Sequence, residues 1–206
     1  MHDAKAGRLL PLAFHVDYWD YIGWKDPFAQ PAFSRRQREL ADRGGARAIY
    51  TPQVVVDTRD FPGWRNTSTF EASLNSAGRR PPGANLSLDL QLESASRWKV
   101  DLRGKLLGGT SREDAVVFLA VYENNLETRV RAGENAGATL RHDYVVRDWL
   151  GPFRIPADGA ISNQADIAIR PDWKPHNLGV AALAFSAPGG EVLQALSLPA
   201  CVTSPK

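Results

Sequence analysis

His15 and Asp17 are the first residues along the chain whose types and spacing could support chemistry. They follow an apolar run that we interpret as a strand, where residues two apart point to the same face. Such a pair could form a proton relay or supply two ligands of a metal site. Zinc usually takes at least three ligands from the protein, and the candidates His142, Asp143 and His176 lie in the other half of the chain. We therefore predict no metal site and interpret His15 as a structural or supporting histidine.

An aromatic loop follows this pair. Its aromatic residues are Tyr18, Trp19, Tyr21, Trp24 and Phe28. Rigid aromatic side chains dominate the energetics of recognition, so Tyr18, Trp19 and Trp24 are candidate substrate-binding residues for a peptide or a sugar. The alternative is that the loop packs inward and braces the sheet. Lys25 and Asp26 could form an ion pair that holds the loop, with little effect on stability. The supporting residues of this region are therefore His15, Asp17, Lys25 and Asp26.

The chain contains one cysteine, Cys201. A single cysteine forms no disulfide within the chain, no Cys-x-x-Cys redox motif and no cysteine-based zinc cluster. Thiol–disulfide exchange needs a thiolate nucleophile and a second cysteine that resolves the mixed disulfide. The chain as given is therefore not a dithiol oxidoreductase, and we expect Cys201 to be a small hydrophobic residue at the end of a strand.

The composition is that of an ordinary globular protein. Of the 206 residues, 43% are hydrophobic and 23% are charged, which is within the usual range. The net charge is +2, from 25 Lys and Arg against 23 Asp and Glu, and because no long basic run accompanies it we expect no nucleic-acid partner. No apolar run reaches about 18 residues, so we predict no membrane span. The polar stretch before the first apolar run is too short for a signal peptide.

The first half of the chain mixes strand and helix patterns. Residues 9–16 are an apolar run typical of a buried strand. Residues 34–43 predict a helix that ends at two glycines. Residues 53–57 predict a β-branched strand, and residues 69–76 predict a short helix capped by Thr69.

Residues 79–83 contain two prolines and a glycine and predict a linker. After the linker the chain is nearly all strand-like, with short runs separated by Gly, Asn and Pro. The expected strands are residues 86–92, 98–102, 115–123, 127–131, 139–146, 165–169, 178–185 and 192–198. Short strands with regular turn signals indicate an antiparallel sandwich. We expect two domains, residues 1–80 and residues 81–206.

Two blocks of sequence are distinctive. The first, His-Val-Asp-Tyr-Trp-Asp-Tyr-x-Gly-Trp-Lys-Asp-Pro-Phe, begins at His15, and the second, Tyr-Thr-Pro-Gln, begins at Tyr50. Together with residues 133–147 they resemble a bacterial thioredoxin-like family that is catalogued as a domain of unknown function. The resemblance covers residues 9–200. It implies an α+β fold in which a partial thioredoxin-like α/β unit is followed by an antiparallel β-sandwich.

The chain departs from this family at its N-terminus. Family members generally begin with a secretion signal, a strand and a Cys-x-x-Cys motif, none of which this sequence contains. We therefore expect the chain to be N-terminally truncated, and a short degenerate relative is the alternative. Thr51 and Pro52 match the Thr-Pro position of the thioredoxin fold, where the proline is cis and guides an extended substrate. The alternative is an ordinary trans proline that opens a strand.

The resemblance implies a thioredoxin-like protein of unknown specific role, which is thiol–disulfide related in its full-length form and periplasmic or secreted. Thr51 and Pro52, with Tyr18, Trp19 and Trp24, would then contact an extended peptide or protein substrate. The alternative is a non-catalytic extracytoplasmic binding module that uses the aromatic loop and the β-sandwich. We expect no cofactor, and the direction of any redox reaction stays open.

Overall fold

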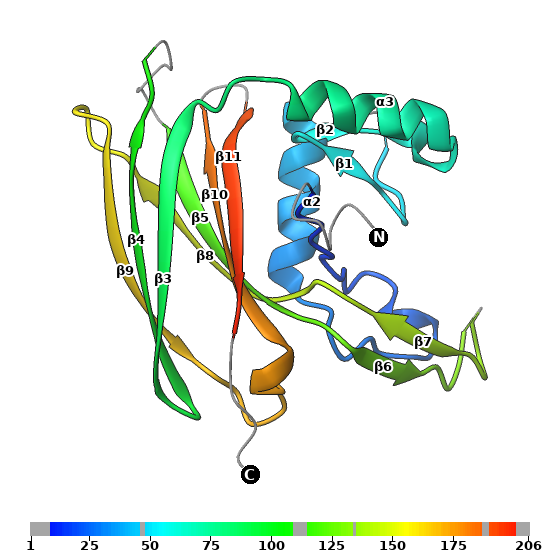
Figure 1. The fold of residues 1–206 in the computed structure, drawn as a ribbon. Coiled ribbons are helices and arrows are strands. Elements are labelled where there is room, and N and C mark those ends of the chain that lie inside the picture. The colour runs from blue at the N-terminus through cyan, green and yellow to red at the C-terminus, as the bar shows by residue number, and fades with distance from the viewer. Residues whose placement is uncertain (1–8, 46–47, 109–114, 134, 187–189, 201–206) are drawn as a thin grey trace.

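Two antiparallel sheets dominate the structure, a computed structural model that describes residues 9–45, 48–108, 115–133, 135–186 and 190–200 (Figure 1). A four-stranded sheet has the order β11–β10–β5–β8, and a three-stranded sheet has the order β3–β4–β9. The strands of the first sheet are β5 (Val116–Glu123), β8 (Val145–Arg154), β10 (Leu178–Phe185) and β11 (Val192–Pro199). Those of the second sheet are β3 (Ala84–Ser94), β4 (Arg97–Leu106) and β9 (Ala160–Ala168).

The main hydrophobic core lies between these two sheets. Successive side chains of a strand point to opposite faces, so every second residue enters the core. In β4 these residues are Trp98, Val100 and Leu102, and in β5 they include Val117 and Leu119, all of which are fully buried. The alternating pattern of β4 therefore fixes which face of the three-stranded sheet packs against its partner.

The two sheets are tied together where β3 passes β11. The backbone N–H of Gly83 donates to the carbonyl of Leu193 at 3.0 Å. The N–H of Leu86 donates to Oε1 of Gln194 at 2.8 Å. These bonds join the start of the three-stranded sheet to the edge strand of the four-stranded sheet.

Helix α2 (Pro31–Arg43) covers the other face of the four-stranded sheet (Figure 1). Pro31 at its first turn costs no helical hydrogen bond, and the helix ends at Gly44. Phe33 packs into a second cluster with residues of β5, β8 and β10. Helix α3 (Thr67–Gly78) begins at Asn66, whose side chain accepts the N–H of Thr69 at 3.1 Å. The cap is therefore Asn66 and not Thr69 as predicted.

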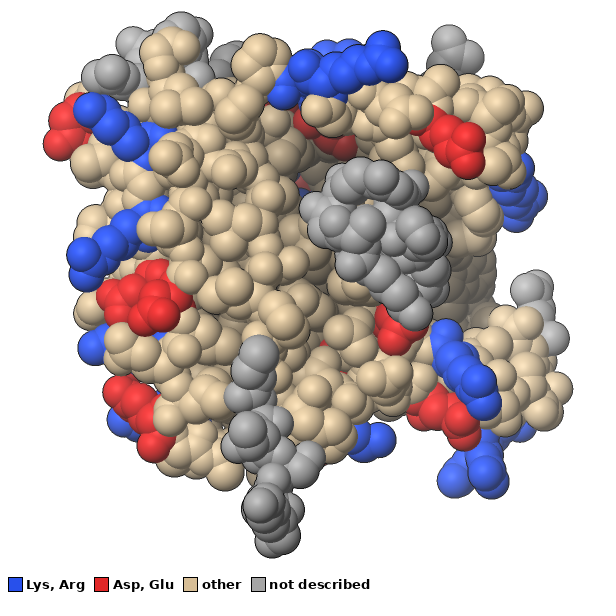
Figure 2. Space-filling view, in the orientation of Figure 1, with Lys and Arg blue, Asp and Glu red and all other residues tan. Residues whose placement is uncertain are grey.

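The remaining elements are short. Two hairpins pair β1 (Val55–Val56) with β2 (Arg59–Asp60), and β6 (Leu126–Arg129) with β7 (Thr139–His142). The described residues also form the 3-10 turns η1 (Asp20–Ile22), η2 (Pro62–Arg65) and η3 (Pro175–Asn177). Figure 2 shows that charged side chains of both signs are scattered over the face seen in Figure 1 and leave large uncharged areas between them.

The predicted fold class is wrong. The described part of the chain is mostly β, with several antiparallel sheets and two α-helices, and it contains no clear thioredoxin-like α/β unit. The physical reason lies in the first half. Among the described residues, 9–16 make a single bridge, from Ala13 to Val145, while Val55 and Val56 pair only with β2. Neither segment therefore joins the other in a thioredoxin-like sheet.

Individual elements agree better with the sequence. The strand predicted at 178–185 is β10 itself, and those at 86–92 and 98–102 lie within β3 and β4. The prediction for Cys201 lies outside the described residues, and the boundary near residue 80 stays a prediction. Among the described residues no helix has the length and hydropathy that a membrane crossing requires.

Candidate binding cleft

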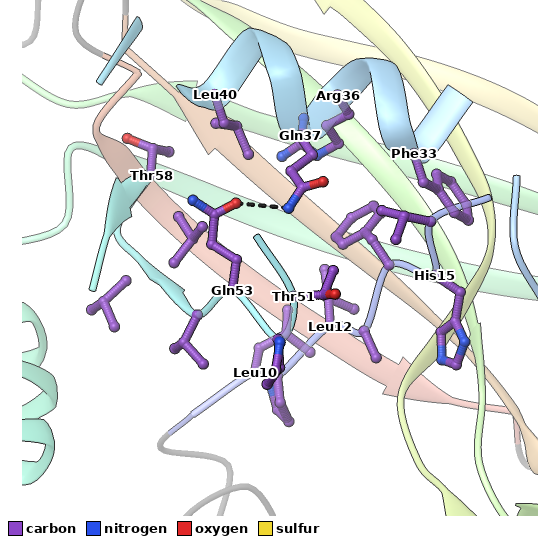
Figure 3. A pocket seen from close by; sticks show the side chains of 18 of the residues that line it. Leu10, Leu12, His15, Phe33, Arg36, Gln37, Leu40, Thr51, Gln53 and Thr58 are labelled. Atoms are coloured by element: carbon purple, nitrogen blue, oxygen red, sulfur yellow. Dashed lines mark hydrogen bonds between the residues drawn. The ribbon is translucent and has the colours of Figure 1, made fainter. Parts of the chain in front are cut away.

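A large cleft separates residues 9–16 from the β1–β2 hairpin (Figure 3). Its volume is about 2030 Å³, whereas sites for small molecules usually occupy about 300–1,000 Å³. The helices and the edge of the four-stranded sheet supply its apolar walls, which include Phe33, Leu40, Phe70, Leu74, Leu183 and Leu193. The cleft is thus large enough for a segment of polypeptide.

One wall of the cleft is an incompletely paired extended segment. The N–H of Ala13 donates to the Tyr144 carbonyl and its carbonyl accepts from the N–H of Val146, both at 2.9 Å. In an extended chain the next residue on either side points its backbone groups the opposite way. Leu12 and Phe14 therefore direct their N–H and C=O groups away from β8, on the cleft side, where no described residue bonds to them.

The β1–β2 hairpin forms the opposite wall. The Val54 carbonyl accepts the N–H of Phe61 at 2.8 Å, so the backbone groups of Val55 point away from β2. Asp57, in the turn of the hairpin and with a positive φ of 53°, anchors the hairpin to the rest of the protein. Its carboxylate accepts the N–H of Val192 at 2.9 Å and pairs with Arg80 at 2.7 Å. The edge presented by Val55 is therefore fixed in place.

The aromatic loop lies at the rim of the cleft. Trp19 and Trp24 line it together with Thr51 and Pro52, and the Trp19 Nε1–H donates to Thr51 Oγ1 at 2.8 Å. The Thr51–Pro52 peptide bond is cis, which confirms the expectation for this bond. Tyr18 instead points toward α2, where its hydroxyl donates to Gln37 Oε1 at 3.0 Å. The structure thus brings four of the five predicted substrate-binding residues to one cleft.

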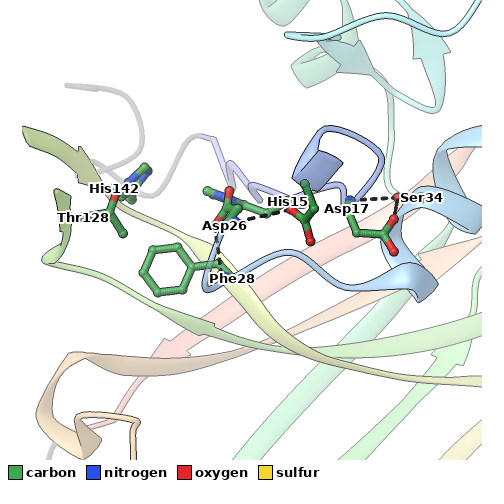
Figure 4. Close-up of polar contacts among 8 residues, drawn as sticks. His15, Asp17, Asp26, Phe28, Ser34, Thr128 and His142 are labelled. Carbon is green, nitrogen blue, oxygen red and sulfur yellow. Dashed lines mark hydrogen bonds and ion pairs between the residues drawn. The ribbon is translucent and has the colours of Figure 1, made fainter. Parts of the chain in front are cut away.

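His15 belongs to a cluster of two histidines at the end of the cleft (Figure 4). Its Nδ1 lies 2.6 Å from Asp26 Oδ2, and its ring centroid lies 5.3 Å from that of His142. His142 is held by Thr128, whose Oγ1 is 2.7 Å from Nε2. Phe28 packs its ring edge-on against both histidines, at 5.4 and 5.5 Å. The cluster therefore connects the N-terminal segment to the β6–β7 hairpin.

Burial and mutual charge set the protonation of this cluster. Burial alone would raise the pKa of Asp26, but the hydrogen bond and charge of His15 outweigh it, so the pKa of Asp26 is lowered. The pKa of His142 is lowered by burial and by the nearby charge of His15, against the opposing effect of Asp26 and Asp143. At neutral pH the cluster accordingly holds an ionised Asp26 and a neutral His142.

The other supporting residues do not gather here. Asp17 accepts a short hydrogen bond from the buried Ser34 hydroxyl and anchors the loop to α2 (Figure 4). The expected ion pair between Lys25 and Asp26 is not formed, because the Asp26 carboxylate pairs with His15 instead. Lys25 is exposed. The described residues contain no group of three or more His, Cys, Asp or Glu that could hold a metal ion.

Arg36 also lines the cleft, and our sequence prediction missed it. It lies three residues after Phe33 and one turn before Leu40, on the inward face of α2. That spacing was the available signal, but Arg36 stands among other arginines that are typical of a solvated helix surface. Gln37 beside it donates to Gln53 Oε1 at 2.8 Å and ties α2 to the segment before β1 (Figure 3).

The fold and the cleft define a mostly β protein with two packed antiparallel sheets and a large apolar cleft on the outer face of one of them. The chain belongs to the family described as "Protein of unknown function (DUF1223)", whose model matches residues 1–184. No curated protein matches the chain.

Two solved structures share the fold. Protein AGR_C_4864 from Agrobacterium tumefaciens is 20% identical, with a TM-score of 0.68 over 100% of this chain and 86% of that one. HBP35 of Porphyromonas gingivalis is 15% identical, with a TM-score of 0.58 over 85% of this chain and 62% of that one. At these identities the likeness concerns the fold alone.

Proposed function

We propose that this protein is a non-catalytic binding protein that captures an extended polypeptide segment in its cleft by strand addition. The observation that carries the proposal is the pair of backbone edges that face the cleft and bond to no described residue on that side. Leu12 and Phe14 present N–H and C=O groups from one wall, and Val55 presents its own from the other. A strand bound between them would form main-chain hydrogen bonds on both of its edges.

The side chains that line the cleft support the same occupant. A bound strand directs alternate side chains to opposite faces. One face would contact α2 and the four-stranded sheet through residues such as Phe33 and Leu183, and α3 supplies further apolar surface through Phe70 and Leu74. The best ligand should therefore carry β-branched or aromatic residues at alternating positions.

The aromatic loop would extend this contact beyond the cleft. Trp19 and Tyr21 stack at 6.2 Å and remain 44% and 78% exposed. Large exposed aromatic side chains at the rim of an apolar cleft are typical of a recognition surface. In this proposal Thr51 and Pro52 belong to the binding wall, and Trp19 is held toward them by its hydrogen bond to Thr51.

Strand capture requires no redox chemistry from this chain. The resemblance described above implies a thiol–disulfide role, which needs a dithiol, and this sequence has one cysteine. The resemblance also implies a periplasmic or secreted protein. Fractionation of source cells, with antibody detection of the chain, tests that location independently of binding.

Binding is tested by fluorescence anisotropy with a labelled ten-residue peptide of alternating Val and Thr, acetylated, amidated and flanked by Lys. Two controls carry N-methyl groups on alternate amides, one control for each edge of the strand. Each backbone hydrogen bond contributes about 1 kcal/mol, or about fivefold in affinity, so we expect each control to bind at least about fivefold more weakly. Equal affinity of the methylated and unmethylated peptides, or no binding of any of them, contradicts strand addition.

The same backbone contact is also tested by changing the protein instead of the peptide. Val55→Pro removes the N–H that faces the cleft, whereas Val55→Thr retains the backbone and the β-branched shape. We expect Val55→Pro to weaken peptide binding by about fivefold or more, through the loss of one hydrogen bond, and Val55→Thr to leave it near the wild-type value. Circular dichroism and thermal unfolding of both variants show whether the fold is intact.

A further inference from the structure

Arg36 occupies an aromatic cage on the wall of the cleft. Its Cζ atom lies 4.3 Å from the ring centroid of Trp149, 5.1 Å from that of Phe14 and 5.8 Å from that of Phe118. Trp149 and Phe118 stack at 4.8 Å with nearly parallel planes. The guanidinium is thus held in one place by the N-terminal segment, β5 and β8, and its position is fixed before any ligand binds.

The charge of Arg36 has no partner within the described part of the chain. No described residue forms an ion pair or a hydrogen bond with it, and its Nε is buried without an acceptor. Burial, with the nearby charge of Arg43, lowers the pKa of Arg36 to about 10, against the opposing charge of Glu39. A buried N–H that has lost water without gaining an acceptor is costly, so the position of Nε needs an explanation.

Arg147 is a second arginine that lies among aromatic rings, and it differs from Arg36 in its carboxylate partners. Its Cζ also lies over aromatic rings, 5.1 Å from Phe28 and 5.5 Å from Trp173. Arg147, however, pairs with Asp172 at 2.5 Å and lies 3.5 Å from the Glu123 carboxylate. Two carboxylates therefore neutralise Arg147, whereas no carboxylate of the described residues neutralises Arg36.

We propose that Arg36 is an anchoring residue for a carboxylate carried by the polypeptide that binds in the cleft. This inference rests on the proposed function and states which polypeptides the cleft would prefer, namely those that carry a suitably placed carboxylate. Both terminal Nη atoms lack a partner in the described chain, and only Nε is fully covered. The two Nη groups can therefore donate in parallel to one carboxylate, while the aromatic cage holds the plane of the guanidinium.

The surrounding charges favour a carboxylate over a phosphate group. Asp20, Asp26, Asp57 and Glu71 also line the cleft, and a dianion would be repelled by them more strongly than a monoanion. Arg80, another arginine of the lining, already pairs with Asp57 and Glu191. The site therefore suits a single negative charge, supplied by an acidic side chain or by the C-terminus of the ligand.

Matched peptides test the proposal and separate these two sources. The alternating Val and Thr peptide is made with one Glu or one Gln scanned through its central positions, always amidated, and a neutral version is made with a free C-terminal carboxylate. We expect one Glu position, or the free C-terminus, to raise affinity about tenfold or more over its neutral match. Arg36→Gln should abolish that gain, so that this variant binds the Glu peptide and its Gln match with equal affinity.

The control variant is Arg38→Gln, which removes the same charge from the exposed side of α2. It should retain the preference for the carboxylate, because only general electrostatic attraction is reduced. Arg36→Lys keeps the charge but loses the two parallel N–H donors of the guanidinium. It should retain less than half of the gain in the logarithm of the affinity that the carboxylate gives. If Arg38→Gln abolishes the preference as fully as Arg36→Gln does, the anchoring role is wrong.

A measurement without peptides keeps this inference separate from strand capture. Acetate is titrated against chloride at constant ionic strength while the ¹⁵N resonances of the Arg36 side chain are followed by NMR. We expect a saturable shift of the Nη signals with acetate and none with chloride. If peptides fail to bind but acetate shifts these signals, strand capture is wrong and the carboxylate site stands. If peptides bind without a carboxylate preference and acetate has no effect, only the anchoring role is overturned.

Discussion

The two faces of the four-stranded sheet are covered in different ways. On one face the three-stranded sheet packs against it, and a continuous core of fully buried side chains fills the space. On the other face α2 and the segment around Ala13 cover only part of the sheet, and a cleft of about 2030 Å³ remains beside β10 and β11. The first face is organised for stability, and the second leaves backbone and side-chain groups available for a ligand.

The largest expected difference between the two faces concerns large side chains. Trp98 is 1% exposed in the core, so Trp98→Ala should destabilise the protein by about 3–5 kcal/mol. Trp19 is 44% exposed at the rim, and Trp19→Ala should cost about 1 kcal/mol or less, mainly through its hydrogen bond to Thr51. Urea unfolding of both variants measures this difference. Equal losses would contradict the assignment of stability to the sheet–sheet core.

The second expected effect concerns the paired arginine. Arg147→Met removes the only ion-pair partner of Glu123 among the described residues and leaves a carboxylate that is 0% exposed, so it should cost about 3 kcal/mol. Burial raises the pKa of Glu123, against the opposing hydrogen bond from the Lys174 N–H and the charge of Arg147. The loss should therefore grow as the pH rises and Glu123 ionises.

Asp172 provides the matched control for this pair. It is the other partner of Arg147, but its side chain is 66% exposed. Asp172→Asn should cost less than about 1 kcal/mol, because exposed ion pairs contribute little. Denaturant unfolding at several pH values compares the two variants, and a cost of Arg147→Met that does not depend on pH would contradict the role given to Glu123.

The two faces also differ in what the sequence could predict. Alternating residues such as Trp98, Val100 and Leu102 report directly which side of β4 is buried, so the strands of the sandwich follow from local pattern. The run at residues 9–16 has the composition of a buried strand, yet within the described part of the chain only its Ala13 forms a bridge, because pairing depends on which segments meet in space. The resemblance placed that run in a thioredoxin-like unit, and the structure does not form it.

The candidate site was predictable in part for the same reason. Thr51, Pro52, Trp19 and Trp24 belong to short blocks that are distinctive in the sequence, and all four line the cleft. The pairing of His15 with Asp26 crosses 11 residues, and the approach of His142 crosses most of the chain. Contacts of that kind leave no local signature.

The third expected effect concerns the cleft wall. Asp57 holds the β1–β2 hairpin to β11 and to Arg80. Asp57→Ala loses both contacts at a residue with positive φ. It should therefore lower the free energy needed to open the hairpin by about 1–2 kcal/mol. Hydrogen exchange of the Val56 and Arg59 amides measures it. Asp57→Asn should recover much of the protection, since Asn tolerates this conformation and can still accept the Val192 N–H. Unchanged exchange in Asp57→Ala would show that the wall is held in another way.

The smallest expected effect concerns the histidine cluster at the end of the cleft. Because the pKa of His142 is lowered in the folded state, the unfolded chain takes up this proton at the higher pH. Its contribution to stability is complete above the ordinary histidine pKa of about 6.5 and is lost as the pH falls below that value. The lowered pKa of Asp26 acts in the same direction in a separate window, below about 4.

His142→Gln isolates the histidine contribution. Glutamine can still hydrogen-bond Thr128 but takes up no proton, so the fall in stability between pH 7 and pH 5 should be smaller than in the wild type. His176→Gln, at an exposed histidine of η3, should leave the wild-type profile unchanged. Urea midpoints across this range, with hydrogen exchange of the β6–β7 amides, give the comparison. If both variants follow the wild-type profile, His142 does not couple the N-terminal segment to that hairpin, and the end of the cleft is as insensitive to pH as the sheet–sheet core.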